Sequence, residues 1–459
     1  MNSTSSEKQL FGARLSEPSY TEVLVKKSLQ ARRRAEARFR AYGLVAVCIA
    51  VSLVFLLFGS ILGKGLPAFW QTEIDLDIYF SPEVVDVDPP PDPLAFDSQA
   101  QYVDARQKWI NGLGFVNFNK LIIDAIARQI PEASQNARAA IALVTSGEKY
   151  ALRDMVAEDP SVIGKTVRLS LLTDANVDVW LKGNIDRSLP DEQQQLRSAT
   201  REWADALYKR GVIQNRFSTT IFMNPDSRSS LASAGLAGAF VGSLYMMLVV
   251  FCLAVPVGVA SAIYLEEFAP RNRWTDLIEV NVNNLAAVPS IVFGLFGASV
   301  FILWFKLPLS APLVGGLVLS LMTLPTVIIS TRASLGAIPP SIREGALAIG
   351  ASKVQVVMDH LLPLATPGIL TATILGVARA LGETAPLLLI GMTAFVASIP
   401  STPLDQASAL PVQVYLWQGN ELRNFFEGRT SAAIIVLLAL LLVMNSLAVL
   451  LRKKFETRW

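Results

Sequence analysis

Residues 339–363 read PPSIREGALAIGASKVQVVMDHLLP and are rich in charged and turn-forming side chains. Two stretches with few charges or none, 312–331 and 367–398, flank them. A membrane helix needs about 20 mostly apolar residues to cross a bilayer, and both flanks meet that requirement. The sequence therefore predicts two membrane-spanning helices joined by a structured loop at the membrane surface.

Two helix start signals lie within this loop. Ser341 followed by Glu344 forms a capping box, in which the hydroxyl caps a backbone amide and the carboxylate reaches back to the serine amide. Gly350 is expected to end this first helix. Ser352 and Gln355 form a second capping box, and the proline near the end of the segment is expected to stop the second helix. On these grounds alone, an interfacial linker and a functional element are equally good interpretations.

In the chain of 459 residues, long apolar stretches lie towards both ends, with a charged block of ordinary composition between them. Charged residues make up 17% of the sequence, against roughly 25% in soluble domains, and the mean hydropathy is +0.42. Both values exclude a simple cytosolic enzyme and predict an all-α polytopic membrane protein. Six stretches are long enough to span a bilayer: 43–63, 236–265, 285–305, 312–331, 367–398 and 430–451.

The first apolar stretch is also compatible with a signal peptide. Its basic flank is long and no small-residue cleavage site follows it, so we interpret it as a retained anchor. Basic residues mark the cytoplasmic side of membrane spans, which places both termini and the loops at 271–273 and 332–366 inside the cell. The basic residues near the termini are Lys26, Lys27, Arg32, Arg33, Arg34, Arg38, Arg40, Arg452, Lys453, Lys454 and Arg458.

These signals predict four parts of the chain: a basic cytoplasmic segment (1–42), an anchor (43–63), an extracytoplasmic domain (64–230) and a membrane domain (231–459). Within the extracytoplasmic part, 89–91 is a proline run, 191–210 has a helical pattern and 167–182 alternates as in a hairpin. An inserted α+β domain is therefore expected. It shows no catalytic constellation, and its acidic residues are interpreted as a solvated surface.

Several kinds of site are excluded by composition. The 40 basic and 38 acidic residues are balanced, which argues against a nucleic-acid partner. Cys48 and Cys252 lie in apolar runs, and His360 is the only histidine, so no disulfide framework and no metal site are predicted. Gly164-Lys165-Thr166 resembles the end of a phosphate-binding loop, but Asp159 occupies the position of the leading glycine. This chain is therefore expected to bind no cofactor and to be no enzyme, and any ATP and Mg²⁺ belong to another chain.

Arg379 and Glu383 lie about a third to halfway along the otherwise uncharged stretch 367–398. A charge near the centre of a membrane helix costs about 2.5–3.5 kcal/mol on insertion scales. Their i, i+4 spacing puts both on one helix face, so a packing salt bridge is one interpretation. Buried pairs seldom stabilise a fold more than apolar residues do, which favours a functional role. The guanidinium fork of arginine suits an oxyanion.

The loop at 339–363 resembles the EAA loop of ABC importer permeases. The resemblance rests on Glu344-Gly345-Ala346, on Gly350 and on Leu362-Pro363, although Gly345 replaces the usual second residue and His360 stands at a usually aliphatic position. It implies that the loop docks into a cleft of a separate ATPase subunit and transmits its closure to the membrane helices. The coupling residues so implied are Ser341, Glu344, Gly345, Ala346, Gly350, Leu362 and Pro363.

Three further stretches are similar to the permease subunits of the phosphate-specific ABC importer. They are GVASAIYLEEFAP at 258–270, LAAVPSIVFGL at 285–295 and ARALGETAPLL at 378–388, the last closest to the PstA type. The resemblance covers residues 231–451 and implies the type I ABC importer permease fold. Because phosphate keeps a proton near neutral pH and sulfate does not, we hypothesise that an ionised Glu383 accepts a hydrogen bond from the P–OH of phosphate and repels fully ionised anions. Arg332 is a second candidate for the anion path, or equally a cytoplasmic anchor.

The resemblance also implies the partners. They are a second permease subunit of the PstC type, two copies of an ATPase subunit and a periplasmic phosphate-binding protein, assembled in the bacterial cytoplasmic membrane. Three alternatives stay open. A permease for molybdate or sulfate is one. A membrane sensor is disfavoured because the chain has no output domain, and an ion-coupled transporter because no internal repeat is evident.

Overall fold

The computed structural model describes residues 20–393 and 395–455, in two compact units, Met1–Ile61 and Leu62–Trp459. Helix α1 (Tyr20–Gly65) runs without a break through the predicted anchor, and the apolar side chains of that anchor are exposed on all sides. A helix that is apolar all round suits a lipid surrounding. The predicted basic residue Arg458 and the start of the predicted segment 1–42 lie outside the described residues.

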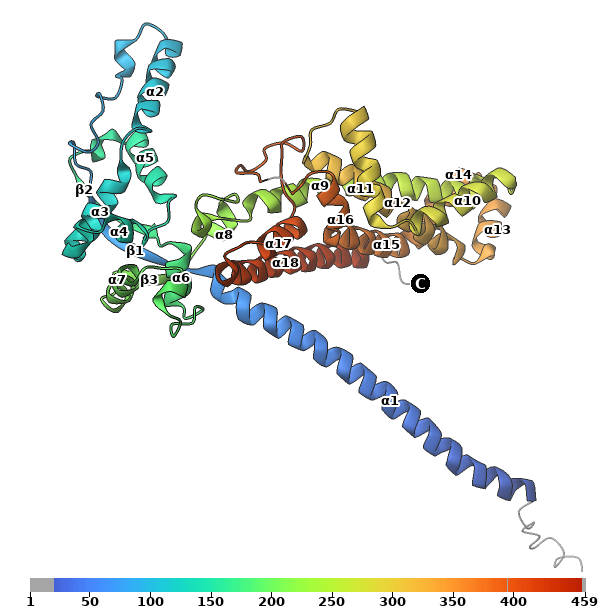
Figure 1. The fold of residues 1–459 in the computed structure, drawn as a ribbon. Helices are drawn as coiled ribbons and strands as arrows, with labels where there is room; N and C mark the ends of the chain where they lie inside the picture. The colour runs from blue at the N-terminus through green and yellow to red at the C-terminus, as the bar shows by residue number, and fades with distance from the viewer. Residues whose placement is uncertain (1–19, 394, 456–459) are drawn as a thin grey trace, which may run out of the picture. The chain divides into compact units, whose positions relative to one another are not determined.

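The second unit contains a bundle of long apolar helices (Figure 1). Within the described residues, five helices of the chain are long and apolar enough to span a membrane, or six if one bent pair counts as a single span. Helix α12 contacts both α9 and α15, and α15 contacts α18. Besides α1, the spanning helices include α9 (Ala237–Ile263), α12 (Pro312–Gly336), α15 (Leu362–Gly382) and α18 (Arg423–Phe455).

The third predicted span, 285–305, is not one straight helix. Helix α10 (Arg273–Ala286) and the helical segment that begins with α11 (Ser290–Gly297) meet at an angle of 101°. The break falls at Pro289, which lacks the amide hydrogen that a continuous helix would need there.

The fifth predicted span, 367–398, is displaced along the chain. Its apolar helix runs continuously from Lys353 to Gly382 and then stops. Our expectation that Pro363 ends a helix is wrong, because Pro363 lies in the first turn of α15. A π-helical turn at Val356–Leu361 immediately precedes it. Such a turn shifts the hydrogen-bond pattern, so a proline without an amide hydrogen is accommodated.

Small residues let the bundle helices approach closely. A Cβ atom on Gly258 of α9 would lie 2.8 Å from the side chain of Val327 on α12. A Cβ atom on Gly316 of α12 would lie 2.5 Å from the side chain of Val249 on α9. Glycine at both faces therefore sets the spacing of this pair, as is common between membrane helices.

Residues 66–230 form an inserted domain with a small antiparallel sheet in the order β2-β1-β3. The central strand is β1 (Trp70–Tyr79), flanked by β2 (Thr166–Leu172) and β3 (Ile213–Phe217). The mixture of helices and strands agrees with the predicted α+β class. The helices are α2 (Gln99–Leu113), α3 (Phe118–Gln129), α4 (Ala137–Ile141), α5 (Glu148–Glu158), α6 (Ala175–Leu181), α7 (Ser198–Lys209) and α8 (Thr220–Met223).

Two local predictions for this domain need correction. The alternation at 167–182 is not a hairpin, because β2 pairs with the distant β1 and residues 175–181 form α6. The helix predicted at 191–210 begins only at Ser198. Leu76 and Ile78 of β1 are buried in one core with Ile122 of α3. The alternation along β2 therefore reflects its pairing with β1, which is distant in the sequence.

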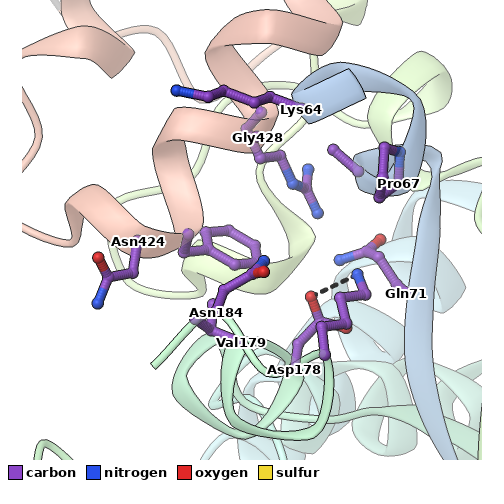
Figure 2. Close-up of a pocket in the computed structure, with 12 residues that line it drawn as sticks. Lys64, Pro67, Gln71, Asp178, Val179, Asn184, Asn424 and Gly428 are labelled. Carbon is purple, nitrogen blue, oxygen red and sulfur yellow. Dashed lines mark hydrogen bonds and ion pairs between the residues drawn. The ribbon is translucent and has the colours of Figure 1, made fainter. Parts of the chain in front are cut away.

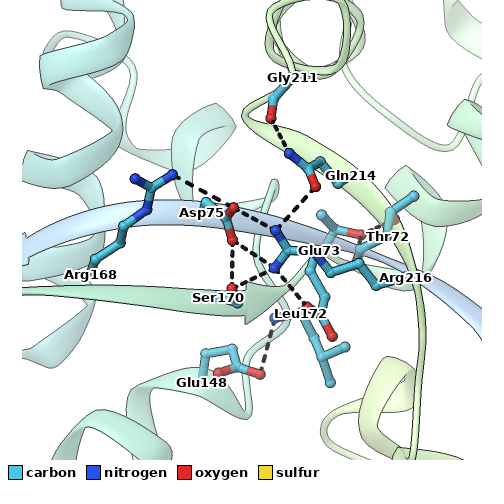
Figure 3. Close-up of polar contacts among 11 residues, drawn as sticks. Thr72, Glu73, Asp75, Glu148, Arg168, Ser170, Leu172, Gly211, Gln214 and Arg216 are labelled. Carbon is cyan, nitrogen blue, oxygen red and sulfur yellow. Dashed lines mark hydrogen bonds and ion pairs between the residues drawn. The ribbon is translucent and has the colours of Figure 1, made fainter.

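The opposite face of the sheet carries a polar network (Figure 3). Arg216 of β3 donates a hydrogen bond of 2.7 Å to Asp75 of β1, and Ser170 of β2 donates one of 2.5 Å to the same carboxylate. Burial opposes ionisation of Asp75, but the hydrogen bonds from Arg216 and Ser170 outweigh it and hold the pKa of Asp75 below its ordinary value. The three strands are thus joined by side chains as well as by backbone pairing.

Glu148 at the start of α5 should make the stability of the inserted domain depend on pH. Burial raises its pKa from 4.5 to about 7, although the amide of Leu172 donates a hydrogen bond to it. The folded state therefore binds the proton more tightly, and this contribution to stability is lost as pH rises from about 4.5 to 7. We expect Glu148→Gln to stabilise the chain at pH 8 by on the order of 1–2 kcal/mol.

The measurement is the thermal unfolding midpoint of the solubilised full chain at pH 5 and pH 8. Glu158→Gln, which changes an exposed carboxylate at the other end of α5, is the matched control. Equal midpoint changes for the two variants at both pH values would contradict the expectation.

Candidate functional site

The loop that joins α12 to α15 contains a short helix, α13 (Pro340–Ala348). Gly350 follows it with φ of +94°, a backbone conformation that favours glycine, so the predicted helix end is confirmed. The second capping box is also confirmed, since the amide of Ser352 donates to Gln355 at 2.9 Å and the amide of Gln355 donates to Ser352 at 3.3 Å.

The first capping box is wrong. Helix α13 already begins at Pro340, whose fixed φ suits the first helical position, and its N-cap residue Pro339 has no capping side chain. Ser341 therefore lies inside the first turn. Glu344 is exposed and free to meet another surface.

Helix α13 buries one residue and exposes most others. Ala346 is 7% exposed and packs in a small core with α12 and α15, whereas Leu347 and Ile349 are 47% and 83% exposed. A Cβ atom on Gly345 would meet nothing within 4 Å, so glycine here answers no packing requirement. The helix thus presents an acidic and apolar surface, as a docking element requires.

Arg343 holds α13 against two other helices, a role that the sequence did not reveal. Its guanidinium donates to Glu267 at 2.7 and 3.0 Å, and to the carbonyl oxygens of Leu335 and Ile338 at 2.8 and 2.9 Å. Glu267 belongs to the π-helical end of α9, and Leu335 to the end of α12. The acidic pair at 266–267 is visible in the sequence, but its partner Arg343 lies 76 residues further along the chain, so the contact could not be predicted.

The guanidinium of Arg332 is also bound by groups from other helices. It donates to Glu266 at 3.1 Å and to Glu279 of α10 at 2.7 Å. With two carboxylates bound, this arginine joins α9, α10 and α12. The geometry favours the anchoring interpretation of Arg332 over an open anion site.

Arg379 and Glu383 lie at the end of α15, because the helix stops at Gly382, and their predicted position within a continuous span is wrong. The Nε atom of Arg379 lies 3.7 Å from Glu383. The side chain of Arg379 is 65% exposed and that of Glu383 is 23% exposed. Val377 and Leu381, on the opposite face of α15, pack into the bundle. The guanidinium of Arg379 therefore faces outward beside a half-buried Glu383, and no hydrogen bond uses its donors within the described residues.

The comparisons place the bundle in a known family. The model of the binding-protein-dependent transport system inner membrane component matches residues 231–457, and a domain of unknown function (DUF3333) matches residues 26–191. The chain is 33% identical over 254 residues to the probable ABC transporter permease protein YqgH of Bacillus subtilis, covering 54% of this chain and 79% of that protein. The chain belongs to the family of binding-protein-dependent transport system inner membrane components.

Other relatives carry a more specific name. The phosphate transport system permease protein PstA of Xylella fastidiosa (strain Temecula1) is 32% identical over 226 residues, or 49% of this chain and 77% of that protein. PstA of Yersinia pestis is 31% identical over 233 residues, or 50% and 77%. A solved amino acid ABC transporter covers 48% of this chain and 91% of its own, at 20% identity and a TM-score of 0.35, which is too distant to support an inference.

Membership in this family defines a multi-pass permease subunit of an ABC transporter, which works with an ATPase and a substrate-binding protein. Helix α13 is an exposed element of the loop between α12 and α15. Its attachment through Arg343 would carry a displacement of α13 directly to α9 and α12.

Arg343→Met should loosen α13. The change removes the hydrogen bonds to two carbonyl groups and leaves Glu267 without its partner, at a cost of about 2–3 kcal/mol. We expect cleavage of the loop 337–353 by a protease to become at least about tenfold faster in the solubilised chain. Lys353→Met, in the same loop and on an exposed side chain, is the control and should leave the rate unchanged. Equal rates in both variants would show that Arg343 does not hold the helix.

Proposed function

We propose that this chain is the PstA-type permease subunit of an ATP-driven importer of inorganic phosphate. Relatives named as phosphate transport permeases, at 31–36% identity, support the substrate. The structural observation that carries the proposal is the outward-facing Arg379 beside Glu383 at the broken end of a membrane helix.

The exposure of Arg379 supports a place on the transport path. An arginine on a membrane helix is costly unless it faces a bundle interior, a water-filled cavity or a partner group. Among residues 20–393 and 395–455, the one ionic partner of its guanidinium is Glu383, at 3.7 Å, which is longer than a hydrogen bond. A second permease subunit facing α15 would enclose the pair, and a phosphate entering between the subunits would complete the coordination of Arg379.

Glu383 gives a reason for selectivity. Near neutral pH phosphate keeps a proton, whereas sulfate does not, so an ionised Glu383 can accept a hydrogen bond only from phosphate. The carboxylate repels a fully ionised anion. In the empty state it partly neutralises Arg379, which lowers the cost of an unoccupied path.

The assembly follows from the same proposal. A PstC-type permease supplies the other half of the path, two ATPase subunits with ATP and Mg²⁺ bind the EAA loops, and a periplasmic phosphate-binding protein delivers the anion. Both termini lie in the cytoplasm of a bacterial cell, six spans result if the bent pair counts as one, and the inserted domain lies outside. Ser341, Glu344, Gly345, Ala346, Gly350, Leu362 and Pro363 form the coupling loop.

Arg379→Gln should abolish phosphate import. The change removes the only charged donor of the pair while keeping a polar side chain of similar reach. In cells that lack their own phosphate permease and express this chain with its partner subunits, we expect uptake of radiolabelled phosphate to fall at least about 100-fold, equivalent to about 2.7 kcal/mol.

Arg271→Gln, at an exposed loop arginine, is the control and should transport normally. Unchanged uptake in Arg379→Gln would return the pair to a packing role. Absence of uptake in the unmodified assembly, with every subunit present in the membrane, would indicate a different oxyanion as substrate.

Glu383→Gln should weaken selectivity rather than abolish transport. An amide no longer repels a fully ionised anion and can donate to it. We expect unlabelled sulfate or molybdate to inhibit phosphate uptake by Glu383→Gln at about tenfold lower concentration than in the unmodified chain. Inhibition at the same concentration in both would exclude this role of Glu383.

A further inference from the structure

Helix α1 extends well beyond the part that can span a membrane. It is continuous from Tyr20 to Gly65, whereas its apolar stretch covers only 43–63 (Figure 1). At a rise of about 1.5 Å per residue, the residues before Gly43 add about 35 Å of helix outside the hydrocarbon. Every side chain from 32 to 60 is exposed. Helices in proteins owe most of their stability to packing, so this part of α1 calls for a partner outside the chain.

The exposed part of α1 at 32–40, here called the basic segment, is strongly charged. Its charged side chains are Glu36 and five arginines, at positions 32, 33, 34, 38 and 40. The single carboxylate is already used, because Arg40 donates to Glu36 at 2.5 Å. Arg34 and Arg38 are spaced i, i+4, where like charges destabilise a helix, and no carboxylate of the described residues pairs with either. The basic segment therefore needs negative charge from outside the chain.

A buried arginine of the bundle shows how such a charge is balanced within the chain. Arg429 of α18 is 1% exposed and lines the pocket shown in Figure 2. It donates to the carbonyl oxygens of Ala232, at 2.7 Å, and of Ala234. The carboxylates of Asp178 and Asp226 also attract it. Apart from the Glu36 carboxylate, the described residues offer the basic segment no such compensation.

Tyr42 marks the level of the membrane surface on α1. It is 71% exposed and directly precedes the apolar stretch, and tyrosine collects at membrane–water interfaces. Arg40 and Arg38 lie about 3 and 6 Å further along the helix, which is within the headgroup layer of about 6 Å. Arg34 and Arg32 lie about 12 and 15 Å from Tyr42, or about 6–9 Å beyond that layer. The Debye length is about 10 Å at 0.1 M salt, so these charges also act on the headgroups.

We propose that the basic segment binds the headgroups of anionic phospholipids and gathers these lipids around α1. Its arginines point to several sides of the helix, because successive residues are about 100° apart, so the binding involves several lipids and no pocket. Basic residues beside a span also orient it during insertion, a role that ends once the span is in place. Lipid binding continues in the folded protein. It does not depend on the proposed import.

The test measures which lipids surround α1 when the full chain is placed in bilayer nanodiscs. Cys48, an exposed residue of the apolar stretch, carries a fluorescent label about 12 Å along the helix from Arg40. Cys252→Ser makes Cys48 the only cysteine. A tracer lipid with a nitroxide on its acyl chain quenches the label at short range, and its headgroup is either anionic phosphatidylglycerol or zwitterionic phosphatidylcholine.

We expect the phosphatidylglycerol tracer to be enriched at least about threefold around the label at low salt, relative to the phosphatidylcholine tracer. The enrichment should disappear at about 1 M salt, where the Debye length falls to about 3 Å. Both leaflets of a nanodisc contain the same lipids, so the result does not depend on the side of the membrane on which the basic segment lies.

Two variants shift the charge in opposite directions. Glu36→Gln removes the carboxylate and releases Arg40, so the enrichment should rise at least about twofold. A combined variant should bring the enrichment close to one; it carries Arg32→Gln, Arg33→Gln, Arg34→Gln and Arg38→Gln. Lysine at the same four positions keeps the charge, and as the matched control it should preserve the enrichment. Since loss of four arginines can disturb insertion, Glu36→Gln, which keeps all of them, is an independent test.

Equal quenching by the two tracers in the unmodified chain at low salt would overturn the proposal. The arginines would then serve insertion or an acidic protein partner. Enrichment that survives the combined glutamine variant, or that Glu36→Gln leaves unchanged, would also overturn it, because the anionic lipids would then be held by another part of the chain. Uptake plays no part in the readout, so a negative result bears on the basic segment alone.

Discussion

The cost of placing an arginine in or beside an apolar bundle governs the polar architecture of this chain. Arg343 meets that cost most completely, with one carboxylate and two carbonyl groups. Arg332 has two carboxylates, and Arg429 has two carbonyls and an aromatic ring. In the described part of the chain, Arg379 has a single ionic partner, a carboxylate at 3.7 Å. Among these four arginines the coordination runs from closed to open, and the guanidinium of Arg379 is the least satisfied.

Arg343 and Arg332, whose guanidinium groups are bound by carboxylates, lie at the end of the bundle that carries the loop with α13. Arg343 joins α13 to the ends of α9 and α12, and Arg332 joins α12 to α9 and α10. Neighbouring carboxylates, Glu266 and Glu267, serve one arginine each. The four helices are therefore linked through adjacent residues, which stiffens this end of the bundle.

Local and periodic features of this fold could be predicted from the sequence, whereas features set by distant partners could not. Four of the six apolar stretches, the Gly350 helix end and the Ser352 capping box depend on residues close in sequence, and they agree with the structure. The hairpin at 167–182 was wrong because β2 pairs with β1, about 95 residues away. The Arg343–Glu267 bridge spans 76 residues and has no local signature. The i, i+4 spacing of Arg379 and Glu383 could be seen in the sequence, but the end of α15 at Gly382, between them, could not be predicted.

The helix ends themselves depend on departures from α-helical geometry. Within the described residues, π-helical turns occur at Tyr264–Phe268, Ala298–Trp304 and Val356–Leu361. The first carries both carboxylates that bind Arg332 and Arg343, and the third leads directly into Pro363. An α-helix sets successive residues 100° apart, and widening one turn shifts the direction of each following side chain. Glu266 and Glu267 lie in such a turn and reach different helices. The apolar pattern that predicts these helices does not show where the π-helical turns occur. Periodicity alone therefore cannot predict that Glu266 and Glu267 join the helices.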